Sequence, residues 1–94
     1  MASDISSGMT VKARANHGAL WEIHLQSAST ADDGDYFLLT SISELKPLGL
    51  ATILNVLGNH TAGATAIAST WSGVTVTIGG SDDNKTHDII VWAY

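Results

Sequence analysis

The 94-residue chain contains no cysteine, which excludes a disulfide framework, a thiolate zinc site and a cysteine nucleophile. It holds only 4 Lys and Arg residues against 9 Asp and Glu, for a net charge of −5. Because proteins bind nucleic acid largely through basic residues that contact phosphates, DNA and RNA are poor candidate partners. Hydrophobic residues still make up 45% of the chain, enough for one globular domain of this length.

Targeting and membrane signals are also missing. The first eight residues include no basic group and no apolar run, so the sequence predicts synthesis in the cytoplasm without a signal peptide. Gly49, Asn55 and Gly58 interrupt the longest apolar stretch well short of the roughly 20 residues that cross a bilayer, and we expect no membrane partner. Segment 1–8 is small and polar without periodicity, which predicts a flexible N-terminal arm.

Alternating apolar and polar residues predict strands before and after the turn at 16–18. The two strands are expected to pair as an antiparallel hairpin. The apolar members, predicted to share one face of each strand, are Met9, Val11, Ala13 and Ala15 in the first and Trp21, Ile23 and Leu25 in the second.

Later segments repeat this pattern. Residues 36–39 form a short apolar run, 65–71 and 74–78 alternate around the turn Ser72-Gly73, and 89–94 is a last apolar strand. About seven short strands at this spacing predict an all-β protein: residues 9–94 as a single antiparallel β-sandwich, jelly-roll or immunoglobulin-like. The predicted core is Val11, Trp21, Ile23, Leu25, Leu38, Val74, Val76, Ile78 and Val91.

Residues 50–57 fit two structures. Leu50, Ile53, Leu54 and Leu57 have helical spacing, whereas Thr52, Ile53 and Val56 are β-branched and suit a strand. We favour the strand because every neighbouring segment is predicted to be one, and allow at most one short helix near 43–57.

Catalytic and metal-binding patterns are absent from the sequence. The four histidines, His17, His24, His60 and His87, are far apart along the chain, and no catalytic motif is present. We therefore predict no enzyme activity, no cofactor and no metal site. The acidic turns 32–35 and 82–83 are interpreted as solubilising surface, because the first lacks the closing Glu of an EF-hand loop; calcium binding at Asp32–Asp35 stays open.

The C-terminal strand is apolar on both faces. Ile89, Val91 and Ala93 can face a core, which leaves Trp92 and Tyr94 together on the opposite side. Either a loop or a partner subunit could cover that second face. With the arm, this face supplies the predicted partner-binding residues, which are Ala2, Ser3, Asp4, Ile5, Trp92 and Tyr94.

In style, the chain resembles the small decoration, or cement, proteins of tailed bacteriophage capsids. The resemblance lies in the polar arm, in Val-Lys-Ala-Arg-Ala at 11–15, in the alternating segments 21–25 and 74–78, and in the aromatic end 91–94. It implies a non-enzymatic, oligomeric β-sandwich on the virion surface that binds the major capsid protein and stabilises the shell. Independently, a chain this short buries a modest share of its surface, so we expect a homo-oligomer, with a trimer as the first expectation. The resemblance does not identify any residue of this chain with a functional residue of that family.

A second function, from a different class, is a carbohydrate-binding β-sandwich module. In such a module an exposed tryptophan stacks on a sugar ring, and loop residues bind its hydroxyl groups. Trp71, beside Ser72-Gly73, or Trp92 would serve as the stacking residue. Quenching of tryptophan fluorescence by a glycan panel distinguishes the two hypotheses, and a neighbouring major capsid gene would support the first.

Overall fold

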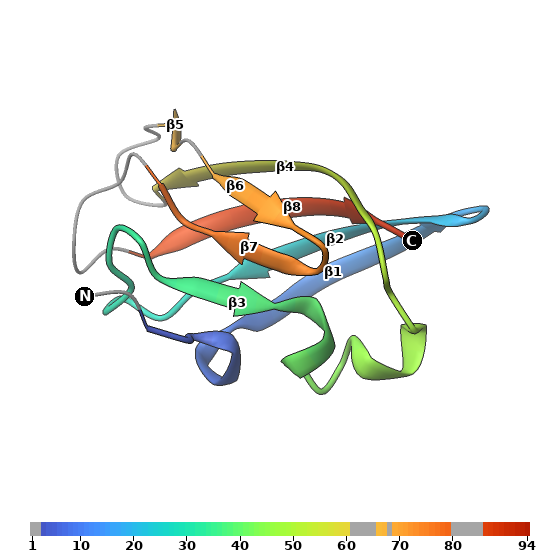
Figure 1. The fold of residues 1–94 in the computed structure, drawn as a ribbon, viewed down its shortest axis with the longest axis horizontal. Coiled ribbons are helices and arrows are strands. Elements are labelled where there is room, and N and C mark those ends of the chain that lie inside the picture. The colour runs from blue at the N-terminus through green and yellow to red at the C-terminus, as the bar shows by residue number, and fades with distance from the viewer. Residues whose placement is uncertain (1–2, 61–65, 68, 80–85) are drawn as a thin grey trace.

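The structure is a computed structural model that describes residues 3–60, 66–67, 69–79 and 86–94. It is an antiparallel β-sandwich in which a three-stranded sheet packs over a five-stranded one (Figure 1), as the sequence predicted. The strands are β1 (Thr10–His17), β2 (Leu20–Gln26), β3 (Tyr36–Leu38), β4 (Ile53–His60), β5 (Ala66–Ile67), β6 (Thr70–Ser72), β7 (Thr75–Thr77) and β8 (His87–Ala93). Their order is β1-β2-β8-β4-β5 in the large sheet and β3-β7-β6 in the small one.

Both predicted hairpins are present. The β1–β2 turn includes Gly18 at φ 75° and the β6–β7 turn includes Gly73 at φ 60°, a backbone conformation that glycine adopts without the steric cost of a Cβ. The predicted strand 65–71 corresponds to β5 and β6, with residues 65 and 68 outside the described part. The last strand, β8, lies between β2 and β4 at the centre of the large sheet.

The core fills the space between the sheets and contains most of the residues predicted for it. Ile23, Leu25, Val76, Ile78 and Val91 are buried, whereas Val11, Trp21 and Val74 are half-buried and pack against the core. The prediction that Leu38 belongs to the core is wrong. On the short strand β3 its neighbour Phe37 faces inward, so the alternation of side chains turns Leu38 outward.

The ambiguous segment 50–57 contains the start of β4, so the strand prediction is confirmed. The described helices are short 3₁₀ turns: η1 (Ser6–Gly8), η2 (Leu39–Ser41) and η3 (Lys46–Leu48). Within the described ranges, no helix is long and apolar enough to span a membrane.

Two β-bulges change which residues share a face. In β1 the register shifts between Val11 and Ala13, so that Val11 opposes Leu25 but Ala13 opposes His24. The predicted single apolar face of β1 is therefore wrong, because a bulge moves every later side chain to the other face. In β4 the register shifts between Ile53 and Asn55.

The N-terminal segment, predicted to be a flexible arm, lies along β3 in the structure. Ile5 N donates to Tyr36 O at 2.8 Å and Tyr36 N to Ser3 O at 3.0 Å, which forms a parallel bridge. Leu38 N donates to the buried Ser6 Oγ at 2.9 Å. Backbone pairing and the packing of Ile5 against the core thus attach residues 3–8 to the edge of the small sheet.

The connection between β3 and β4 closes one end of the sandwich. Four of its apolar side chains are buried and Leu48 is half-buried, although the segment contains no strand. Arg14 Nη1 donates to Glu44 O at 3.0 Å, which attaches the connection to β1. Sequence alternation could not identify these core residues, because loop side chains follow no fixed period. They are Leu39, Ile42, Leu45 and Leu50.

Candidate partner-binding face

The side of the five-stranded sheet that faces away from the small sheet is called here the outer face. Directly opposed residues of neighbouring strands point to the same side, so the register defines this face from the pairs Glu22↔Trp92, His24↔Ile90 and Leu57↔Ile90. The described outer-face residues are Thr10, Ala13, Ala15 and His17 of β1; Leu20, Glu22, His24 and Gln26 of β2; Asp88, Ile90 and Trp92 of β8; Asn55 and Leu57 of β4; and Tyr94, which continues the alternation of β8.

A polar network centred on Glu22 crosses the middle strands of this face. His24 Nε2 donates to Glu22 Oε2 at 2.8 Å, and Trp92 Nε1 donates to Glu22 Oε1 at 3.1 Å. His17 Nε2 lies 3.9 Å from the same Oε1 atom. The network joins β1, β2 and β8, and it fixes both the carboxylate and the indole ring in position.

The same contacts determine the charge of Glu22. The hydrogen bond from His24 and, second, the one from Trp92 lower the pKa of the Glu22 carboxyl below its ordinary value of about 4.5, against an opposing effect of partial burial. Glu22 is therefore ionised at neutral pH. Its side chain is 31% exposed, so the charge stays accessible from solvent.

Apolar side chains extend the outer face toward β4. Leu57 is 56% exposed and lies opposite the half-buried Ile90. Leu54, the residue at the β4 bulge, is 58% exposed, and Tyr94 is 52% exposed. Large apolar residues exposed together on one side of a small domain are typical of a surface that binds a partner.

The two groups of predicted partner-binding residues lie apart. Ala2 is outside the described residues, and Ser3, Asp4 and Ile5 occupy the edge of the small sheet beside β3. Trp92 and Tyr94 lie in and after β8, which belongs to the five-stranded sheet.

Sequence reasoning missed the polar and aliphatic parts of the outer face. Glu22 and Leu57 come from strands far from β8 in the sequence, so only the pairing register shows that they adjoin Trp92 and Ile90. The available signal was local: Glu22 and His24 alternate with buried residues and therefore had to share one face of β2.

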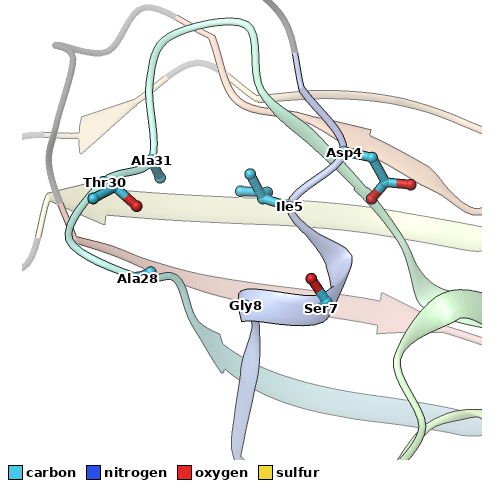
Figure 2. A pocket seen from close by; sticks show the side chains of 7 residues that line it. All are labelled: Asp4, Ile5, Ser7, Gly8, Ala28, Thr30 and Ala31. Atoms are coloured by element: carbon cyan, nitrogen blue, oxygen red, sulfur yellow. The ribbon is translucent and has the colours of Figure 1, made fainter.

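The N-terminal segment borders a shallow pocket of about 180 Å³ (Figure 2). Its walls are mostly small or aliphatic, and the Asp4 carboxylate at its rim accepts hydrogen bonds from Ser6 N and Ser6 Oγ. These bonds lower the pKa of Asp4, so its charge serves to fix the turn at η1. The pocket is lined by Asp4, Ile5, Ser7, Gly8, Ala28, Thr30 and Ala31.

The acidic turn 32–35 has a structural role through its last residue. Asp35 is buried, its Oδ1 accepts from Ser3 N at 3.0 Å, and its Oδ2 accepts from Asp32 N at 2.8 Å. Backbone donors thus occupy both oxygens of the most buried carboxylate in this turn. In the described part of the chain, no group of three or more His, Asp or Glu side chains could hold a metal ion; the turn 82–83 lies outside that part.

His24 and His87 lie in different surroundings and make different hydrogen bonds. His24 bonds Glu22 on the outer face, whereas His87 is fully buried, with its backbone N–H donating to Ser27 Oγ at 2.8 Å. The side chain of His60 lies outside the described part.

Comparison of the chain with known protein families, with curated proteins and with solved structures gives no match. The candidate face therefore has to be interpreted from its own chemistry.

Proposed function

We propose that the chain is a non-enzymatic structural protein, a capsid decoration protein that binds the major capsid protein on the virion surface through its outer face. The observation that carries this proposal is the outer face itself, where Trp92 bonds one ionised carboxylate and the exposed side chains of Leu57 and Tyr94 lie on the same side of the sheet. A face that combines exposed apolar side chains with fixed polar groups suits attachment to another protein. The capsid is proposed as the partner because the sequence resembles those of capsid decoration proteins.

Self-association is part of this proposal. A chain of 94 residues without disulfides buries a modest share of its unfolded surface, so contacts between copies would add stability. We expect a homo-oligomer, with a trimer as the first form to test. Sedimentation velocity at micromolar concentration gives the answer, and a stable 9.8 kDa monomer would contradict self-association in solution.

Co-sedimentation with empty shells tests attachment directly. The shells should be assembled from the major capsid protein whose gene lies nearest to that of this chain. We expect Leu57→Lys to reduce occupancy at least tenfold, because it places a charge in the apolar part of the outer face. Trp71→Ala is the matched control, since Trp71 is also an exposed apolar residue but lies on β6 of the other sheet. Equal occupancy by the parent and Leu57→Lys would overturn the proposed attachment.

Deleting residues 1–8 does not test attachment cleanly, because these residues also contribute to the fold. Ile5 packs against the core and Ser6 binds Leu38 N, so the deletion would expose the edge of β3 and weaken the fold. Single substitutions on the outer face separate binding from folding more cleanly. Salt weakly screens contacts of the apolar part of that face, so shell occupancy should change less with salt concentration than in a complex held by charge alone.

The carbohydrate-binding alternative has one observation in its favour. Trp71 is 39% exposed on β6, so part of its indole ring is accessible for stacking on a sugar. Quenching of tryptophan fluorescence by a glycan, removed by Trp71→Ala and unchanged in Leu57→Lys, would favour this function over capsid binding.

A further inference from the structure

We propose that the outer face binds an arginine side chain of the partner, with the guanidinium bonded to Glu22 and stacked against Trp92. This inference rests on the proposed function, because it takes the partner of the outer face to be another protein. It adds the chemistry of the contact, and therefore the kind of surface that this face selects.

The first argument is charge complementarity. The titratable side chains on the outer face are the carboxyls Glu22 and Asp88, the imidazoles His17 and His24, and the phenol of Tyr94. Of the described Lys and Arg residues, Arg14 pairs with Ile23 on the other face and Lys46 lies in η3. Lys12, at the bulge of the edge strand β1, adjoins Ala13, whose partner is His24 and not Glu22. Around Glu22, which pairs with Ala15 and Trp92, the face thus presents anionic charge to a partner.

The second argument is the fixed geometry of Glu22. Trp92 Nε1 and His24 Nε2 each bond a different oxygen of the carboxylate, so its plane is set before any partner arrives. A carboxylate has about four acceptor positions, and these two bonds use one on each oxygen. A preorganised carboxylate that keeps free acceptor positions suits a planar two-pronged donor.

The third argument is the adjacent indole. Trp92 is half-buried on the outer face, and its N–H bond to Glu22 holds the edge of the indole ring against the carboxylate. A guanidinium bound to Glu22 would therefore be next to the indole, and the proposal is that it extends over the face of that ring. Arginine combines stacking on such rings with two-pronged bonding to carboxylates, whereas the lysine ammonium is a compact, strongly hydrated charge. The pair consequently favours arginine.

Charge also argues against a second copy of this chain as the occupant. Arg14 donates to Glu44 O and lies 6.0 Å from the centre of the Trp21 ring, on the opposite side of the sheet. Two outer faces packed together would each present Glu22 and Asp88, and no arginine, to the other. The occupant is therefore a different chain, with an arginine surrounded by apolar residues that contact Leu57 and Ile90.

The test uses the full chain and three peptide probes, acetyl-Ile-Xaa-Ile-amide with arginine, lysine or the uncharged arginine analogue citrulline at Xaa. Binding is followed by nuclear magnetic resonance from the shifts of the Trp92 indole N–H and the His24 ring. We expect the arginine peptide to bind at least about tenfold more tightly than the citrulline peptide, and more tightly than the lysine peptide. Glu22→Gln should abolish this preference. Asp88→Asn, which removes the other outer-face carboxylate, should keep it.

Equal binding of the arginine and citrulline peptides, or no binding of either, would overturn the proposal, as would an equal loss in Asp88→Asn and Glu22→Gln. Shell co-sedimentation distinguishes this failure from failure of the proposed function. Shells that bind the parent and Glu22→Gln equally well would leave the capsid function intact and remove only the arginine contact. A preference for the arginine peptide without shell binding would leave the arginine contact intact and contradict the capsid function.

Discussion

Strand β8 carries two different surfaces, one on each side of the same seven residues. Its inward side chains, which include Ile89 and Val91, are fully buried between the sheets. Its outward side chains, which include Ile90 and Trp92, are half-buried and adjoin a polar network. Both sides are rich in apolar atoms, so hydrophobicity alone does not distinguish them. They differ in coverage: the three-stranded sheet covers the inner side.

This difference indicates a division of roles. On the inner face, apolar side chains from both sheets interdigitate, and burial there supplies most of the folding free energy. On the outer face, Glu22 fixes Trp92 by a hydrogen bond and gives the surface a defined shape and charge. Stability should therefore depend on the inner face and partner binding on the outer one.

The largest expected effect is on the inner face, at Ile23. Its side chain is fully buried, so Ile23→Ala should lower the free energy of unfolding by about 2 to 5 kcal/mol through lost burial and a cavity. Denaturant titration measures this change. Ile90→Ala, the matched outer-face variant, should cost clearly less because Ile90 is half-buried. Equal losses would mean that the two faces contribute alike to folding.

A smaller loss is expected where the inner face contains polar groups. The buried hydroxyl of Ser27 accepts from His87 N at 2.8 Å, so Ser27→Ala removes the acceptor of a buried N–H and should cost about 1 to 3 kcal/mol. Ser29→Ala, at an exposed turn nearby, should change stability by less than about 0.5 kcal/mol. Similar melting temperatures for the two variants would contradict a structural role for the Ser27–His87 contact.

The sequence alone predicted the inner face well, because strict alternation leaves few choices. Burying Ile23 and Leu25 forces Glu22 and His24 outward, and the same holds along β8. The hairpin at Gly73 followed from its turn chemistry. These features depend on local patterns, which a single sequence contains.

Features that depend on long-range pairing could not be predicted. The bulge in β1 reverses the direction of Ala13 without any change in composition, and residues 3–5 pair with β3 through backbone atoms that any residue has. Of the outer face, the sequence indicated Trp92 and Tyr94 but not Glu22, because the partner of a tryptophan N–H depends on which strands adjoin. The order of strands in the sheet, with β2 next to β8, determines that Glu22 is the residue beside Trp92.

The outer network should give a moderate, pH-dependent effect. The folded state lowers the pKa of Glu22, so it binds this proton less tightly than the unfolded chain does. The resulting stabilisation is present above about pH 4.5, the ordinary value, and is lost as the pH falls through the lowered folded value. Stability measured from pH 7 to pH 2 should therefore fall less steeply in Glu22→Gln than in the parent. His24→Leu, which removes the leading cause of the shift, should reduce the slope in part, and identical slopes in all three proteins would contradict the network.

The smallest stability effect is expected at Leu57, and it separates the two roles most sharply. Leu57 is 56% exposed and loses only part of its contact with Ile90 when substituted, so Leu57→Lys should change the free energy of unfolding by less than about 0.5 kcal/mol. The same substitution should strongly reduce shell binding, because a charge must then be desolvated at an apolar contact. Denaturant titration and co-sedimentation on one protein preparation measure both quantities. A large loss of stability would mean that the outer face supports the fold, and unchanged shell binding would place the partner elsewhere on the molecule.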